Sequence, residues 1–297
     1  MSHLKTIVAA TDLSAPSRHA AYRAARMART HGATLTLVHA LGSTALDDLR
    51  RWLSDSAAAQ AAVEDDARDR LHALALELGQ RTGLAVRELL VTGHPVEAVT
   101  QHVSDAGADL VVTGTRGAGF FRGVVVGSTA ERIAGRSGRP VLMVRQTPHQ
   151  AYRRVLVPVD FSPWSATAIV LALQAAPRAT LILMHAVEVP FEGRLRLAGV
   201  ADKAIGEYRD AARHEAQQKL RDLAVHAGVA ADRWRPVTVD GAAPWMLIAQ
   251  QEQEYDCELI VIGRQGRHAV EELLLGSTTR MVMSECSADV LISTHRG

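Results

Sequence analysis

Short apolar runs alternate with longer amphipathic segments along the first half of this 297-residue chain. Runs rich in branched apolar side chains predict five strands, over residues 6–10, 34–39, 86–91, 110–113 and 141–144. The segments between them predict helices that end near Thr30 and that cover residues 57–82, 95–106 and 128–137. Strands that alternate with helices predict an α/β fold, with a parallel sheet covered by helices on both faces.

The second half repeats this order, with strands predicted over residues 155–159, 181–187, 235–239, 259–262 and 290–293. Helices are predicted from Pro163, over residues 201–227, from Pro244 and from Thr278. The halves align with one residue inserted at Gly241-Ala-Ala-Pro244 relative to Gly93-His-Pro95. A repeat of domain size predicts duplication, with domains over residues 1–146 and 154–297 and an aperiodic linker at 147–153.

Composition and charge are those of a globular protein with material for two cores. Hydrophobic residues make up 47% of the chain, and 33 basic residues nearly balance 32 acidic ones, for a net charge of +1. This balance gives no reason to expect binding to nucleic acid or to an anionic membrane. The first residues carry no signal-peptide pattern and no apolar run approaches a membrane span, so a cytoplasmic location is expected. Cys257 and Cys286 are expected to be reduced thiols.

Each half carries the same glycine motif directly after its fourth predicted strand. Gly114-Thr-Arg-Gly117 and Gly263-Arg-Gln-Gly266 are each followed by nine residues and then by Gly-Ser-Thr. Glycines permit positive φ and close approach to a ligand, and a helix that starts at Gly-Ser-Thr directs free N–H groups at an anion. The alternative is an ordinary strand-to-helix loop. A P-loop is excluded because no lysine follows Gly127 or Gly276, and a dinucleotide fingerprint fails because Arg122 stands at its third glycine.

An aspartate follows the first strand of each half, Asp12 in one and Asp160 in the other. If the strand order is 3-2-1-4-5, strands 1 and 4 are neighbours at the switch point of the sheet, where ligands bind beyond the carboxyl ends. The aspartate and the glycine loop then converge on one ligand. The alternative is that each aspartate only caps the following helix.

Together, this motif and aspartate resemble the ATP-binding signature of the universal stress protein family, in its tandem form. The resemblance implies two doubly wound, Rossmann-like or flavodoxin-like domains with five-stranded parallel sheets. It also implies an adenine nucleotide as ligand, ATP with Mg²⁺ as cofactor, and a role as a stress-response regulator or sensor with a protein partner that the sequence does not identify. The residues implied to bind the nucleotide are Asp12, Val38, Thr113, Gly114, Gly117, Gly127, Ser128 and Thr129, and in the second half Asp160, Met184, Ile262, Gly263, Gly266, Gly276, Ser277 and Thr278. Val38 and Met184 align with the position where the family's main chain recognises adenine.

Two other functional classes stay open. The same scaffold could support a slow ATPase or an adenylyl-transfer enzyme, although no catalytic residue is predicted and the thirteen histidines form no metal-ligand set. A nucleotide-free interaction protein is the other alternative. The apolar final strands, residues 141–144 and 290–292, suggest edges for association and leave room for a homodimer.

The charges of the two glycine loops predict that the first half binds ATP more tightly. The first loop carries Arg116 and Arg122, whereas in the second Glu271 and Glu272 offset its two arginines. Two charge units about 8 Å from a polyphosphate correspond to about 1 kcal/mol, close to a tenfold difference in affinity. An opposing point is that Val157-Pro-Val-Asp160 matches the family's first-strand ending better than the equivalent residues of the first half.

Overall fold

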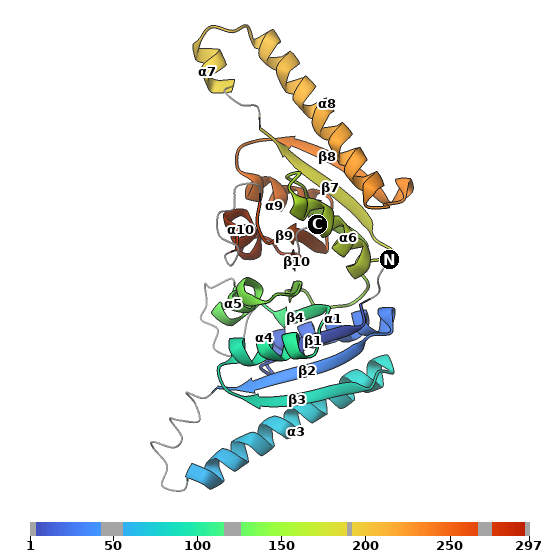
Figure 1. Ribbon diagram of the computed structural model, residues 1–297, viewed down its shortest axis with the longest axis vertical. Coiled ribbons are helices and arrows are strands. Elements are labelled where there is room, and N and C mark those ends of the chain that lie inside the picture. Colours follow the sequence, from blue (N-terminus) through green and yellow to red (C-terminus); the bar gives the residue numbers. More distant parts are fainter. Residues whose placement is uncertain (1–3, 43–55, 116–125, 189–191, 267–274, 295–297) are drawn as a thin grey trace. The chain divides into compact units, whose positions relative to one another are not determined.

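The structure, a computed structural model, describes residues 4–42, 56–115, 126–188, 192–266 and 275–294 (Figure 1). Contacts divide the chain into two compact units. The first runs to Ala151 and also includes Ser287–His295, and the second runs from Tyr152 to Cys286 without Leu273–Leu275. The division between Ala151 and Tyr152 lies in a segment with neither helix nor strand.

The first unit is built on a sheet of parallel strands in the order β3-β2-β1-β4-β5. Their bounds are β1 (Thr6–Ala10), β2 (Thr34–Leu41), β3 (Val86–Thr92), β4 (Leu110–Gly114) and β5 (Val141–Val144). This confirms the α/β fold and the strand order 3-2-1-4-5. The carboxyl ends of β1 and β4 are neighbours, since Ala10 pairs with Thr113.

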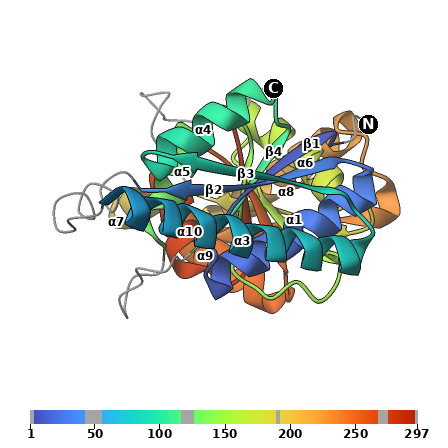
Figure 2. The ribbon, with the colours of Figure 1, turned by 90° about the horizontal axis from the view of Figure 1, so that it is seen from below.

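Helices cover both faces of this sheet. They are α1 (Ala15–His31), α3 (Ser56–Thr82), α4 (Pro95–Asp105) and α5 (Ser128–Arg136). Figure 2 shows α1 and α3 on one face and α4 and α5 on the other. Helix α1 lies close to the sheet because its contact face is made of alanines, among them Ala20, Ala24 and Ala28, which are fully buried. It ends where expected, at Gly32, whose φ of 65° is left-handed.

Strand β10 (Asp289–Ser293) pairs with β5 in the antiparallel direction, which departs from an all-parallel sheet. The carboxylate of Asp289 holds this pairing. Its Oδ1 accepts the main-chain N–H groups of Arg145 and Gln146 at 2.7 and 3.0 Å, and its Oδ2 lies 3.4 Å from Nε of Arg23 in α1. The pairing occupies the edge of β5 that suggested association, and the homodimer stays a prediction.

The second unit repeats the first four strands, in the order β9-β6-β7-β8. Its strands are β6 (Arg154–Pro158), β7 (Thr180–Val187), β8 (Trp234–Asp240) and β9 (Leu259–Gly263). Its helices are α6 (Pro163–Ala175), α7 (Glu192–Leu197), α8 (Asp202–His226), α9 (Pro244–Glu254) and α10 (Ser277–Glu285), with a 3-10 helix at Ala231–Arg233. The sequence did not predict α7 or the 3-10 helix. Within the described ranges, no helix is long and apolar enough to cross a membrane.

An acidic side chain aligns the two central strands of each unit. Asp109, just before β4, accepts the main-chain N–H groups of Lys5 and Thr6 at 2.7 and 3.0 Å. Glu258, just before β9, accepts the N–H groups at the start of β6 at 2.7 and 2.9 Å. Because each acid joins strand 1 to strand 4, it sets the register of the two strands whose carboxyl ends form the switch point.

Cys257, which precedes β9, is predicted to resist thiol reagents in the folded protein. Burial raises the pKa of its thiol to about 12, and three nearby carboxylates add to the shift while Arg154 opposes it. At pH 8 the thiolate fraction is then about one in ten thousand, against roughly a quarter for an ordinary cysteine. We expect labelling with a chromogenic disulfide at least about 100-fold slower in the native protein than in guanidinium. Equal rates would contradict a folded-state burial of this thiol.

Candidate functional site

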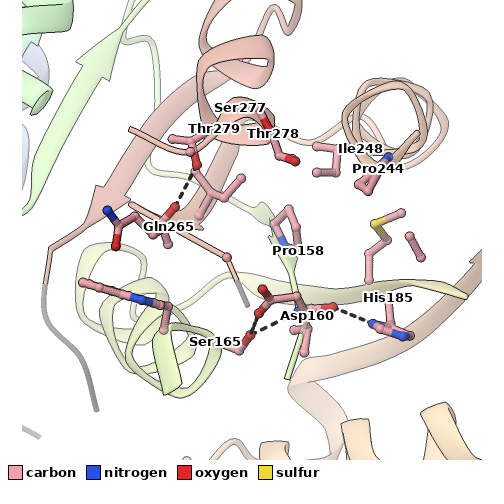
Figure 3. Close-up of a pocket in the computed structure, with 18 of the residues that line it drawn as sticks. Pro158, Asp160, Ser165, His185, Pro244, Ile248, Gln265, Ser277, Thr278 and Thr279 are labelled. Carbon is pink, nitrogen blue, oxygen red and sulfur yellow. Dashed lines mark hydrogen bonds between the residues drawn. The ribbon is translucent and has the colours of Figure 1, made fainter. Parts of the chain in front are cut away.

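A cavity of about 750 Å³ opens at the carboxyl ends of β6, β7 and β9, within the second unit (Figure 3). Its volume lies in the range of small-molecule sites. All eight candidate residues of the second half line it, namely Asp160, Met184, Ile262, Gly263, Gly266, Gly276, Ser277 and Thr278. The aspartate and the glycine loop therefore converge as the switch-point argument predicts.

The cavity has an apolar part and a polar part. The apolar part is formed by side chains of β6, β7, α9 and β9, namely Pro158, Met184, Pro244, Ile248 and Ile262. The polar part is formed by Asp160, Ser165, Gln265 and the first turn of α10. Figure 3 shows Asp160 and Ser165 on one side of the cavity and Ser277 and Thr278 on the other. The arrangement suits an elongated ligand with an apolar end and a polar or anionic end.

Asp160 is held in place by hydroxyl and N–H donors from the start of α6. Its Oδ1 accepts the main-chain N–H of Ser162 at 3.0 Å, the hydroxyl of Ser162 at 2.6 Å and the hydroxyl of Ser165 at 2.9 Å. The helix N-cap is Ser162, as Ser14 is in the first half. The alternative in which the aspartate is itself the N-cap is therefore wrong, because the N-cap serine lies two residues after the aspartate in each half.

The residue after each aspartate has a left-handed backbone, with φ of 62° at Leu13 and 60° at Phe161. A non-glycine residue in this conformation costs about 1 kcal/mol. The turn persists in both halves because the aspartate carboxylate bonds the N–H two residues on, at Ser14 and Ser162. Because the same strained conformation occurs at equivalent positions of both halves, we infer that function requires the carboxylate to lie at this place.

The glycines of the loops provide space rather than unusual backbone angles. A Cβ on Gly263 would lie 2.8 Å from Cβ of Trp164, and a Cβ on Gly114 would lie 3.1 Å from the carbonyl oxygen of Pro16. A Cβ on Gly266 would lie 3.0 Å from Oδ2 of Asp160. The described loop glycines do not use the positive φ that glycine permits; they are Gly114, Gly127, Gly263, Gly266 and Gly276. Gly114 and Gly263 have no room for a side chain because the end of the fourth strand of each half passes directly against the first turn of the helix after the first strand.

Helix α10 directs its first turn at the polar part of the cavity. Its N-cap is Gly276, which has no side chain to accept from the N–H groups of Thr278 and Thr279, the second and third residues of the helix. The N–H of Gly276 donates to the carbonyl of Arg264 at 2.9 Å and closes the base of the loop. Thr279, which the sequence did not single out, donates its hydroxyl to the carbonyl of Gly263 at 2.9 Å. This bond ties the start of α10 to the end of β9.

The end of β7 offers main-chain groups, but from a different residue than expected. The carbonyl of Met184 accepts the N–H of Val159 at 2.7 Å, so it is already engaged. Main-chain groups two residues apart in a strand point to the same side. Ala186, which lines the cavity, therefore directs its N–H and C=O past the end of β6. His185 is held beside it, since its Nδ1 donates to the carbonyl of Val159 at 2.7 Å.

The first unit contains the same framework. Asp12 follows β1, Val38 lies within β2, and Thr113 and Gly114 end β4. Gly127, Ser128 and Thr129 begin α5, whereas Gly117 lies outside the described residues. The N–H of Gly127 donates to the carbonyl of Thr115 at 2.7 Å, and that of Thr11 donates to the carbonyl of Val38 at 2.9 Å. His39 bonds the carbonyl of Thr11 at 2.8 Å, as His185 bonds its equivalent.

The charged side chains in the described lining of the cavity are Asp160 and Glu188. Burial lowers the pKa of the nearby Arg264 guanidinium, which still remains a cation at neutral pH. No set of three or more histidine, cysteine, aspartate or glutamate side chains is placed to hold a metal ion in the part of the chain that the structure describes.

Comparison with known proteins assigns the family. The model of the universal stress protein family matches twice, over residues 3–145 and 151–293. The chain belongs to the universal stress protein family. A universal stress protein of Mycolicibacterium smegmatis is 28% identical over 98% of this chain and 97% of its own length. One of Thermus aquaticus is 34% identical over 48% of this chain and 98% of its own length, as expected for a match to one half.

A solved universal stress protein from Archaeoglobus fulgidus has the same fold. It covers 98% of this chain and 98% of its own, with a TM-score of 0.70 and 19% sequence identity. The tandem universal stress protein organisation is thus supported by the family model, by a relative that matches over its full length and by a structure of the same fold. Family membership assigns the protein to the stress-response class of α/β proteins.

Proposed function

We propose that this universal stress protein binds ATP in the cavity of its second half and acts as a cytoplasmic regulator or sensor in the stress response. The observation that carries the proposal is the order in which apolar, acidic and anion-binding groups follow one another along one cavity. An apolar slot is followed by the Asp160 carboxylate and then by the open first turn of α10. A nucleotide has the matching order of an apolar base, a hydroxylated sugar and an anion.

The base occupies the slot between Met184, Ile248 and Ile262. The main-chain N–H of Ala186 donates to N1 of adenine, and its carbonyl accepts from the exocyclic amine. This edge-on contact needs no particular side chain, which explains why an alanine can occupy the position. The apolar walls contribute the larger part of the binding free energy by desolvating both faces of the base.

The sugar and the phosphates occupy the polar part. Asp160 accepts hydrogen bonds from the ribose hydroxyls, and the three donors to its Oδ1 set the orientation of the carboxylate. The phosphates lie at the N–H groups and hydroxyls of Ser277 and Thr278, where the helix dipole favours negative charge. Mg²⁺ would arrive with the ATP phosphates, and the hydroxyls of Ser277 and Thr278 fit its preference for oxygen ligands.

The equivalent residues of the first half support a second ATP site. Asp12, Val38, Thr113 and the start of α5 repeat the positions of the second-half site. The proposal also includes a protein partner and a homodimer. Through them, a regulator would report to other molecules whether its nucleotide sites are occupied.

The direct test is whether the purified protein carries nucleotide. Acid-denatured supernatant should contain ATP or another adenine nucleotide in an amount comparable to that of the protein, and calorimetry on nucleotide-free protein should show saturable binding of Mg-ATP. A protein that carries none and binds none, while its melting curve shows it folded, would remove ATP binding from the proposal.

ATP is predicted to bind at least about tenfold more tightly than GTP. The pair of main-chain groups at Ala186 matches the acceptor N1 and donor amine of adenine, whereas guanine presents a donor N1–H and an acceptor oxygen at these places. A mismatched pair of hydrogen bonds corresponds to about 1–3 kcal/mol of discrimination. Calorimetric titrations with both nucleotides at the same Mg²⁺ concentration measure this ratio. Equal affinities would show that the base edge is not read by the main chain.

A further inference from the structure

The residue that follows the second strand differs between the halves. Glu188 follows β7 and lines the cavity, whereas Gly42 follows β2 at the equivalent place. We propose that the Glu188 carboxylate reads the exocyclic amine of adenine, and that the second site therefore selects adenine over guanine nucleotides more strongly than the first. The inference rests on the proposed ATP binding and concerns how each site recognises the base.

Glu188 lies next to the main-chain groups that are proposed to bind the base. Side chains of a strand alternate between its two faces, so Met184, Ala186 and Glu188 share one face, and all three line the cavity. Met184 forms a wall of the base slot, and Ala186 presents its main-chain groups to the edge of the base. Glu188 follows the last residue of β7 and is exposed, so its carboxylate lies at the mouth of the slot.

A carboxylate at this place distinguishes the two purines. The amine of adenine has two protons, of which the carbonyl of Ala186 accepts one and Glu188 accepts the other. Guanine has an oxygen in place of the amine, and an oxygen that faces a carboxylate brings together two acceptors without a proton between them. Acceptance of a base amine by a carboxylate is a recurring form of base recognition. The same group thus attracts one ligand and repels the other, which is how selective sites are built.

The apolar walls of the slot differ in size between the halves. At three wall positions the second half has the larger side chain, Met184 for Val38, Ile248 for Val99 and Ile262 for Thr113. Apolar walls by themselves discriminate weakly between an amine and an oxygen, so selection depends on the polar groups at the base edge. A closely fitting slot holds the base where its edge meets Ala186 and Glu188 together, whereas a wider slot lets the base shift away from a mismatched group.

The first half has no acidic side chain at this place. Gly42 has no side chain, and a Cβ built on it would have no atom within 4 Å. The main-chain groups of Ala40 correspond to those of Ala186, so the first site retains the preference for adenine that the main chain provides. It lacks the additional contact and the repulsion of guanine. We expect the ratio of ATP affinity to GTP affinity to be about tenfold higher at the second site than at the first.

A single-site protein allows the second site to be measured alone. Asp12→Ala leaves the second site in the full-length chain, and Glu188→Gln in this background replaces the carboxylate with an amide of the same shape. Calorimetry with Mg-ATP and Mg-GTP should show that the ratio of ATP affinity to GTP affinity falls about tenfold, because an amide can donate to the guanine oxygen. An unchanged ratio in a variant whose melting curve shows it folded would overturn the proposal. Absence of ATP binding by this protein and by the unmodified chain would instead reject the proposed function.

A ligand without the amine separates base recognition from a structural role of Glu188. Purine riboside triphosphate has a hydrogen in place of the amine of adenine. In the Asp12→Ala background, Glu188→Gln should change its affinity by less than about twofold while weakening ATP clearly more. An equal loss for the two ligands would show that Glu188 supports the shape of the cavity and does not read the amine.

The first site provides a test by gain of selectivity. In the Asp160→Ala background, which leaves the first site, Gly42→Glu adds a carboxylate where the structure leaves room for a side chain. The ratio of ATP affinity to GTP affinity should rise about fivefold or more. Gly42→Gln is the matched control, since it adds a side chain of the same length without the charge. Equal ratios for the glutamate and glutamine variants would refute selection by a carboxylate at this position.

Discussion

Replacing Asp289 with alanine is expected to lower the free energy of unfolding by about 3–5 kcal/mol. The side chains of Asp289 and Arg23 are 0% and 5% exposed, and their charged groups lie 3.4 Å apart. The substitution removes the buried carboxylate that faces the guanidinium, and it also removes the acceptor for the N–H groups of Arg145 and Gln146. Urea unfolding followed by circular dichroism measures the change.

An exposed ion pair in the same unit provides the control. Arg68 and Asp65 are 2.6 Å apart in α3, with side chains 58% and 71% exposed. Asp65→Ala should change the free energy of unfolding by no more than about 0.5 kcal/mol, because water already solvates both charges. If Asp289→Ala costs no more than this control, the buried pair does not hold β10 against β5.

Replacing Gly263 with alanine is expected to destabilise the protein by about 2–3 kcal/mol and to abolish ATP binding at the second site. The new Cβ would lie 2.8 Å from Cβ of Trp164, an atom that cannot move without its backbone. The strain must be relieved by separating the end of β9 from the start of α6. That movement also separates Asp160 from the glycine loop. Thermal unfolding and ATP titration in the Asp12→Ala background measure the two effects.

Gly276→Ala is the matched control in the same motif. Its Cβ would lie 3.5 Å from the carbonyl oxygen of Arg264, an ordinary contact, and the φ of Gly276 is −59°. We expect a loss of at most about 1 kcal/mol, the usual cost of a poorer N-cap residue. If Gly263→Ala and Gly276→Ala have equal effects, crowding against Trp164 is not the reason for the first glycine.

Much of the fold follows from the pattern of apolar residues. The first and fifth strands were predicted with the bounds they have, Thr6–Ala10 and Val141–Val144, because fully buried parallel strands read as unbroken apolar runs. Proline and glycine marked helix ends, as Gly32 does for α1. Helix α7 was not predicted, because six residues are too few to establish a helical period against a charged background.

The candidate site was predictable where its residues repeat and not where they are chemically ordinary. Asp160 and the glycines stood out through their spacing in both halves. Ser165, Ala186 and Thr279 did not, since a serine, an alanine and a threonine near a helix or strand end have many common roles. Ser165 could have been found from the sequence, because Ser17 stands at the equivalent position of the first half, five residues after the aspartate.

The sequence by itself determined the duplicated α/β architecture, the placement of the candidate site residues at the switch points and the family to which the chain belongs. These depend on periodicity, on spacing and on rules of chain connection, all of which are local or repeated. Only the tertiary structure decided that β10 pairs antiparallel with β5, that Gly114 and Gly263 have no room for a side chain, and that Ser165 bonds Asp160. The physical reason is that contact distances and hydrogen-bond directions depend on which groups meet after folding, and a hydroxyl proton can be given to one acceptor only.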